Sequence, residues 1–123
     1  MLSLPRRIAR TRRREPPRIV TDSEGFVVNV SDGKTLSVRW SDVVAVLAYK
    51  RDLLTTDEVI LAFRQQPDPE VVLEISEEWP GFQDLFEPLS NALGIGDAWY
   101  LETTRKPFDT DFRILFDRRK SLP

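Results

Sequence analysis

The sequence predicts an α+β domain in which a curled antiparallel sheet of five to seven strands is covered by one amphipathic helix. Two observations carry this prediction. Several short runs rich in β-branched and aromatic residues are separated by turn-forming residues, as expected for strands. One later stretch instead repeats its apolar residues at helical spacing, and no regular strand–helix alternation appears.

The first predicted hairpin pairs residues 25–30 with residues 34–40. The two runs, GFVVNV and KTLSVRW, flank an Asp-Gly pair, which is typical of a type I′ turn because that turn needs positive φ at both central residues. In the second run, Leu36, Val38 and Trp40 recur at every other position. This spacing predicts that the three side chains share one face of the strand and point toward the core.

A second hairpin is predicted between 57–65 and 70–76. The first of these runs alternates, and the intervening QPDPE segment holds two prolines, which cannot donate to a strand ladder. The stretch at 41–50 is compatible with a helix capped by Ser41, but its valines favour an extended chain. A strand is therefore preferred there.

The predicted helix lies within residues 77–94. Gly94 suits the left-handed position that ends many helices, whereas Pro88 inside the pattern predicts a kink or a later start of the regular helix. Two further runs, at 98–104 and 112–117, are predicted as strands. The apolar residues of the helix follow one face: Phe82, Leu85, Phe86, Leu89 and Leu93.

The charge divides the chain near residue 18. Seven arginines and one glutamate give residues 1–20 a charge of +6, and the remaining 11 basic and 19 acidic residues give 21–123 a charge of −8. We expect a disordered basic arm at 1–18, one folded domain at 19–117 and a tail at 118–123. Arginine binds phosphate well, so the arm would suit weak contact with nucleic acid or an anionic membrane. The arginines concerned are Arg6, Arg7, Arg10, Arg12, Arg13 and Arg14.

The chain contains neither cysteine nor histidine. This excludes disulfides, thiol nucleophiles and sites built on histidine, which is the usual general base near neutral pH and the commonest metal ligand. No catalytic residue, cofactor or metal site is therefore predicted, and a non-enzymatic role is expected. No apolar run approaches the roughly 20 residues of a membrane-spanning helix and no signal peptide is apparent, so a cytoplasmic location is expected.

A charged segment follows the apolar run at 41–48 and is the candidate partner surface. Tyrosine and arginine are common anchors of protein interfaces, which favours Tyr49 and Arg51, with Lys50 and Asp52 as a polar rim. A solvated turn is the alternative for this segment. The indole of Trp79 either offers a docking edge or covers the core at the entry to the helix.

The runs VTDSEGFVVNV and SDGKTLSVRWSDVVAV resemble the opening of bacterial pleckstrin-homology-like and GRAM-like domains, where a hairpin leads into a tryptophan–aspartate step. The run from WSDVVAVLAYKRDLL to EEWPGF is also similar to a group of short bacterial proteins of unassigned function. The resemblance covers about residues 20–93 and implies a PH-like half-barrel with a binding or scaffold role. It carries no catalytic residue. Only Lys34 and Arg39 stand in the first hairpin, where lipid-binding members carry a basic cluster.

These observations favour a non-enzymatic binding or scaffold domain that engages a protein partner. The alternative is an immunity or inhibitor protein that covers a basic toxin or enzyme with its acidic face. A homodimer is compatible with either function. A carboxylate-dependent metal hydrolase is the third and weakest interpretation, because the chain lacks histidine.

Overall fold

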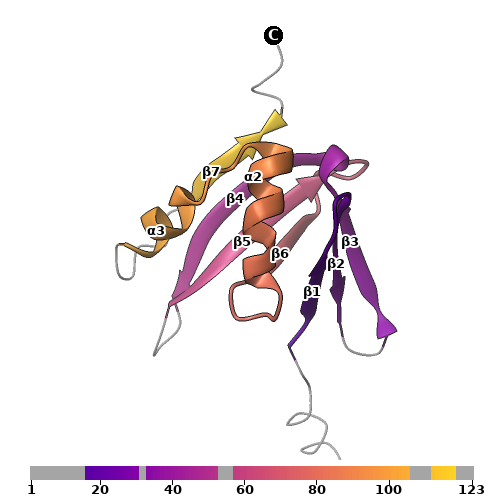
Figure 1. The fold of residues 1–123 in the computed structure, drawn as a ribbon, viewed down its shortest axis with the longest axis horizontal. Coiled ribbons are helices and arrows are strands. Elements are labelled where there is room, and N and C mark those ends of the chain that lie inside the picture. Colours follow the sequence, from indigo (N-terminus) through magenta and orange to yellow (C-terminus); the bar gives the residue numbers. More distant parts are fainter. Residues whose placement is uncertain (1–15, 31–32, 53–56, 106–111, 119–123) are drawn as a thin grey trace, which may run out of the picture.

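The computed structural model describes residues 16–30, 33–52, 57–105 and 112–118, together with all their side chains except that of Asp52. Within these residues the chain forms seven strands and two α-helices (Figure 1). The strands are β1 (Arg18–Thr21), β2 (Gly25–Asn29), β3 (Thr35–Arg39), β4 (Val43–Asp52), β5 (Asp57–Gln65), β6 (Val72–Ser76) and β7 (Arg113–Asp117). The helices are α2 (Phe86–Leu93) and α3 (Ala98–Thr104), with short 3₁₀ turns η2 (Trp40–Asp42) and η3 (Phe82–Leu85).

The strands form two antiparallel sheets, one of three strands in the order β1-β2-β3 and one of four in the order β6-β5-β4-β7. The predicted α+β class is confirmed, but the prediction of one curled sheet under one helix is wrong. The η2 turn changes the direction of the chain after β3, and β4 then pairs with β5 and β7. A single ladder therefore does not run from the first hairpin into the second.

The hairpin predicted near the start of the fold is present as β2 and β3. Val38 and Trp40 are buried as expected, but Leu36 is 48% exposed. Leu36 lies opposite Val28 on an edge strand of its sheet, so strand periodicity alone did not decide its burial. The predicted Asp-Gly turn lies partly outside the described residues, and Gly33 has a φ of 74°.

The strand preferred at 41–50 is confirmed as β4, and the second hairpin is confirmed as β5 and β6. Alternate residues of β5 enter the core, including Leu61 and Phe63. Phe63 packs edge-on against Phe26 of the other sheet with 5.0 Å between ring centroids. The two sheets therefore share one hydrophobic core.

The helical stripe predicted at 82–93 is confirmed, although its first turn is the 3₁₀ turn η3. Phe82, Leu85 and Leu89 are fully buried. Pro88 occupies the third position of α2, where its missing N–H costs no helical hydrogen bond. Gly94 ends the helix with a φ of 72°, as predicted.

The strand predicted at 98–104 is wrong, because these residues form α3. Trp99 and Thr103, four residues apart, are both buried on one face of this helix. Trp99 packs against Phe82 and Phe86, with ring centroids 6.4 and 5.4 Å apart. Tertiary packing on the preceding helix thus overrides the β propensity of a Trp-Tyr pair.

Both ends of the described chain are attached to the core. Ile19 of β1 is buried and donates its backbone N–H to the Pro80 carbonyl at 2.8 Å. Arg118, assigned to the tail from the sequence, donates from Nε to the Val43 carbonyl at 2.7 Å. No helix in the described part of the chain is long and apolar enough to cross a membrane.

Candidate functional site

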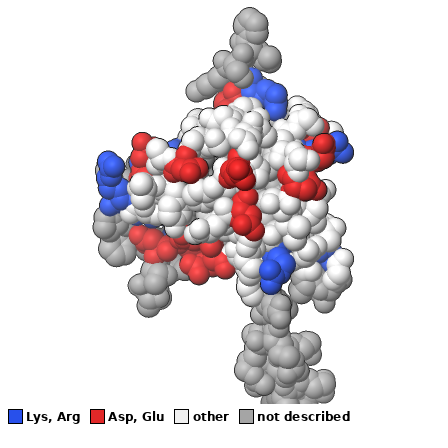
Figure 2. Space-filling view, in the orientation of Figure 1, with Lys and Arg blue, Asp and Glu red and all other residues white. Residues whose placement is uncertain are grey.

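A cleft of about 730 Å³ lies between the β1–β2 turn and the polar side of α2. We call it the acidic cleft, because the described residues that line it include three carboxylates and no lysine or arginine. Figure 2 shows acidic side chains along α2 on this face of the molecule. The lining residues are Thr21, Asp22, Ser23, Trp40, Gln83, Asp84, Glu87, Pro88, Asn91 and Ala92.

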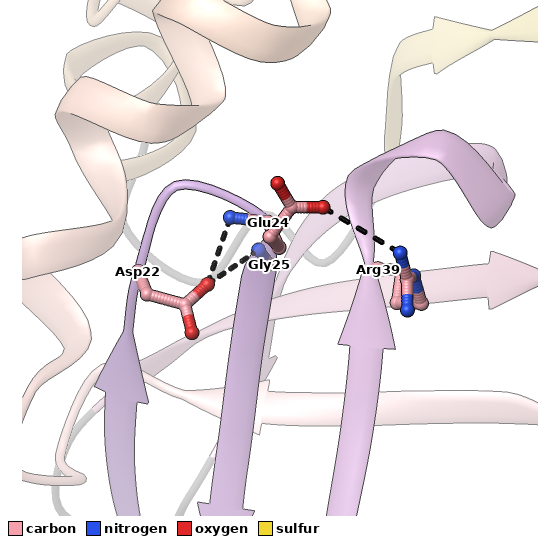
Figure 3. A network of polar contacts seen from close by, with 4 residues as sticks. All are labelled: Asp22, Glu24, Gly25 and Arg39. Atoms are coloured by element: carbon pink, nitrogen blue, oxygen red, sulfur yellow. Dashed lines mark hydrogen bonds and ion pairs between the residues drawn. The ribbon is translucent and has the colours of Figure 1, made fainter.

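The β1–β2 turn forms one wall of the acidic cleft and is held by the side chain of Asp22 (Figure 3). Asp22 Oδ1 accepts backbone N–H groups from Glu24 at 2.8 Å and Gly25 at 3.0 Å, the pattern of an Asx turn. The exposed ion pair between Glu24 and Arg39, at 3.5 Å, adds little stability beside these bonds. Asp22 therefore has a structural role in the turn as well as a charge in the cleft.

Trp40 occupies the inner wall of the cleft and is only 5% exposed. Its backbone N–H donates to the Glu24 carbonyl at 3.0 Å, which ties the β1–β2 turn to η2. Its ring packs against Phe26 with 5.5 Å between centroids. The indole Nε1 is buried and has no hydrogen-bond acceptor among the described residues.

The opposite wall of the cleft is the polar side of η3 and α2. Asp84, Glu87 and Asn91 recur at spacings of three and four residues, opposite the buried stripe of the same helix. The chain before the helix is pressed against β1, where a Cβ added to Gly81 would lie 2.0 Å from the Ile19 carbonyl oxygen. Gly81 also has a φ of 93°, so only glycine suits this close approach.

The electrostatics of the acidic cleft favour a cationic ligand. Asp22, Asp84 and Glu87 form no ion pair with any described residue. The described residues also include no group of three or more carboxylates placed to hold a metal ion, so these three do not converge on one point. Carboxylates that are spread along the cleft in this way suit an extended basic segment better than a single metal ion.

The partner surface predicted at the end of β4 is divided by strand alternation. Tyr49 is half-buried and Arg51 is exposed on one face of β4. Lys50 points the other way, is 3% exposed, and pairs with Asp57 at 3.4 Å, so it is not part of that surface. The side chain of Asp52 lies outside the described residues.

Arg51 and Trp79 already have contacts within the fold. Arg51 donates to Glu74 of β6 at 2.8 Å, and both side chains are substantially exposed. Trp79 is half-buried and packs against the core where the chain enters η3. Neither residue lines the acidic cleft. The six arginines predicted as an anionic-ligand arm lie outside the described residues.

A second polar cluster joins α3 to the end of β6. The Tyr100 hydroxyl donates to Glu77 Oε1 at 2.6 Å, and Glu77 Oε2 accepts the Val59 backbone N–H at 2.9 Å. The hydrogen bond to Glu77, with burial and the negative charge nearby, raises the pKa of Tyr100 to about 12. The carboxylate of Glu77 therefore links α3 to β5 of the four-stranded sheet.

This raised pKa predicts a loss of stability in alkaline solution. In the unfolded chain Tyr100 ionises near its ordinary pKa of 10, and in the folded chain near 12. The Tyr100 contribution is therefore complete below pH 10 and is lost as the pH rises toward 12. We expect denaturant midpoints to fall less steeply over this range in Tyr100→Phe than in the wild type. An identical pH dependence of the two proteins would contradict the assignment.

The acidic cleft was not identified from the sequence. Its walls come from residues 21–23, 40 and 83–92, which are far apart in the chain. The available signals were the acidic polar side of the predicted helix and the DSEG turn before the first hairpin. No family model, curated protein or solved structure matches this chain.

Proposed function

We propose that this protein is a non-enzymatic binding domain that engages a protein partner by accepting a basic segment in the acidic cleft. The observation that carries the proposal is a cleft of about 730 Å³ lined by three carboxylates that form no ion pair with any described residue. Complementary charge steers association and discriminates against acidic competitors. The net charge of −8 over residues 21–123 adds a longer-range attraction for basic partners.

The chemistry of the cleft suits a peptide segment in particular. The carboxylates of Asp84 and Glu87 would receive the guanidinium or ammonium groups of the segment. A binding role also agrees with the resemblance to PH-like and GRAM-like domains. The proposed binding role involves no catalytic residue and no cofactor.

Neutralising the helix side of the cleft is expected to weaken partner binding. In Asp84→Asn/Glu87→Gln the two exposed charges are removed with little change in shape, while Asp22 is retained because it holds its turn. We expect a loss of about 1 kcal/mol, or roughly fivefold in affinity at low salt. Quantitative capture of partners from the natural host with each variant as bait measures this loss.

The matched control is Asp68→Asn/Glu70→Gln, which removes the same charge from two exposed residues in the β5–β6 turn. A partner that depends on the acidic cleft is retained by the wild type and by this control, and is depleted with the cleft variant. Melting curves of all three proteins establish that the fold is unchanged. Equal retention by all three baits would contradict the proposal.

An immunity or inhibitor function is the second candidate, and the same acidic surface favours it. In that case the basic segment belongs to a toxin or enzyme whose working surface is covered on binding. A reading frame for a basic toxin beside the gene would favour this candidate. Inhibition of that toxin at one-to-one stoichiometry, reduced by Asp84→Asn/Glu87→Gln, would distinguish it from a scaffold.

A further inference from the structure

We infer that the arginine-rich arm of the chain itself occupies the acidic cleft, so that a basic partner has to displace it. This inference rests on the proposed function, because it requires the cleft to accept a basic segment. The inference adds regulation to that function. The arm would compete with a partner for the acidic cleft, and so would set the affinity that a partner needs. The arm is the segment of residues 1–15, which lies outside the described part of the chain.

Charge complementarity is the first argument. The arm carries six arginines and one glutamate, whereas the described residues of the cleft include three carboxylates and no basic side chain. Guanidinium groups bind carboxylates in a bidentate manner, so several arginines in sequence match several dispersed carboxylates.

The length of the arm is the second argument. It joins the described chain at Pro16, and the cleft begins at Thr21, the last residue of β1. Pro16 and Thr21 are five residues apart, which is at most about 17 Å of extended chain. Arg10 lies six residues before Pro16 and can extend about 20 Å. The arm thus has enough chain to reverse and return along β1 to the cleft.

Attachment to the same chain favours this occupant over a partner in solution. A short flexible connection gives a tethered segment an effective concentration of about 1 mM. A free basic protein therefore competes at a disadvantage until its own affinity exceeds that of the arm. The apparent affinity for any partner equals its intrinsic affinity multiplied by the fraction of molecules in which the arm has left the cleft.

The test uses the intact protein with one paramagnetic label. Because the chain has no cysteine, Ala9→Cys accepts a nitroxide at a single position in the arm. We expect the backbone amide NMR signals of the cleft to lose most of their intensity relative to the reduced label. Signals of the opposite end of the four-stranded sheet should be retained. The reporting amides are those of Thr21, Asp22, Ser23, Gln83, Glu87 and Asn91.

Two variants decide whether the acidic cleft is the cause. In the Asp84→Asn/Glu87→Gln background the loss of intensity should disappear, and in the Asp68→Asn/Glu70→Gln background it should persist. A mixture of isotope-labelled protein without nitroxide and unlabelled protein with nitroxide should show no loss. Uniform broadening, equal broadening in both variants, or broadening only in the mixture would overturn the inference.

A free deca-arginine peptide separates this inference from the proposed function. If the arm occupies the cleft, replacing four of its arginines with glutamine should strengthen binding of the peptide about tenfold. The replaced residues are Arg10, Arg12, Arg13 and Arg14. The tenfold figure applies when the effective concentration of the arm at the cleft is about ten times the intrinsic dissociation constant of the arm. If the peptide shifts the cleft signals equally in both proteins, the cleft binds basic segments but the arm is not its occupant. If the peptide does not affect the cleft at all, the proposed function fails as well.

Discussion

Phe63→Ala is expected to lower the free energy of unfolding by about 3–5 kcal/mol. Phe63 is 1% exposed on β5 and packs edge-on against Phe26 of β2, which in turn contacts Trp40. The substitution leaves a cavity where the two sheets meet, and neither sheet can close it without moving the other. Chemical denaturation followed by tryptophan fluorescence measures the change.

The control for this experiment is Val72→Ala, on the neighbouring strand β6. Val72 is 40% exposed, so its replacement should lower the free energy of unfolding much less than Phe63→Ala does. A Phe63→Ala midpoint close to that of the control would mean that the two sheets do not share a core. The cleft would also be affected in Phe63→Ala, because Trp40 rests on the same aromatic cluster.

Gly25→Ala is expected to lower the free energy of unfolding by a similar amount. The cause here is a clash with the backbone and not a cavity. A Cβ at residue 25 would lie 1.9 Å from the Val38 carbonyl oxygen and 2.9 Å from the Arg39 Cα. Both contacts are with backbone atoms of β3, so no side-chain rotation relieves them. We expect a loss of about 3 kcal/mol, at the upper end of the usual range for overpacking.

Gly96→Ala is the matched control, because no described heavy atom beyond its chain neighbours lies within 4 Å of the added Cβ. Its effect should stay within about 0.5 kcal/mol. The same pair tests the cleft, since Gly25 donates its N–H to Asp22 and a displaced β2 would open the turn. Equal melting temperatures for the two variants would contradict the close approach of β2 to β3 at Gly25.

Local patterns in the sequence predicted most of the regular structure. The strands β2 to β7 and the stripe on η3 and α2 all follow from local signals. These signals are β-branched and aromatic composition for the strands, alternation along β3 and β5, and recurrence every three to four residues along the helix. Gly94 likewise ends its helix for a local reason, its freedom to adopt positive φ. The charge division near residue 18 was also determined by the sequence alone.

Tertiary structure decided α3 and the division into two sheets. Residues 98–104 have the composition of a strand, and only packing of Trp99 against Phe82 and Phe86 favours a helix. The pairing of β4 with β7 joins segments separated by two helices, which no local pattern specifies. Strand alternation placed Lys50 in the interior beside Asp57, where its charge alone had indicated a surface.

The acidic cleft depends entirely on tertiary structure. Asp22 and Glu87 are 65 positions apart in the chain (87 − 22), and they line one cleft because the Ile19–Pro80 hydrogen bond and the glycine at 81 hold β1 against the entry to α2. The sequence by itself determined the acidic side of the helix and the Asp22 turn. The helix and the turn lie side by side because two segments that are distant in the chain pack closely together. Residue type and spacing do not encode such a long-range contact.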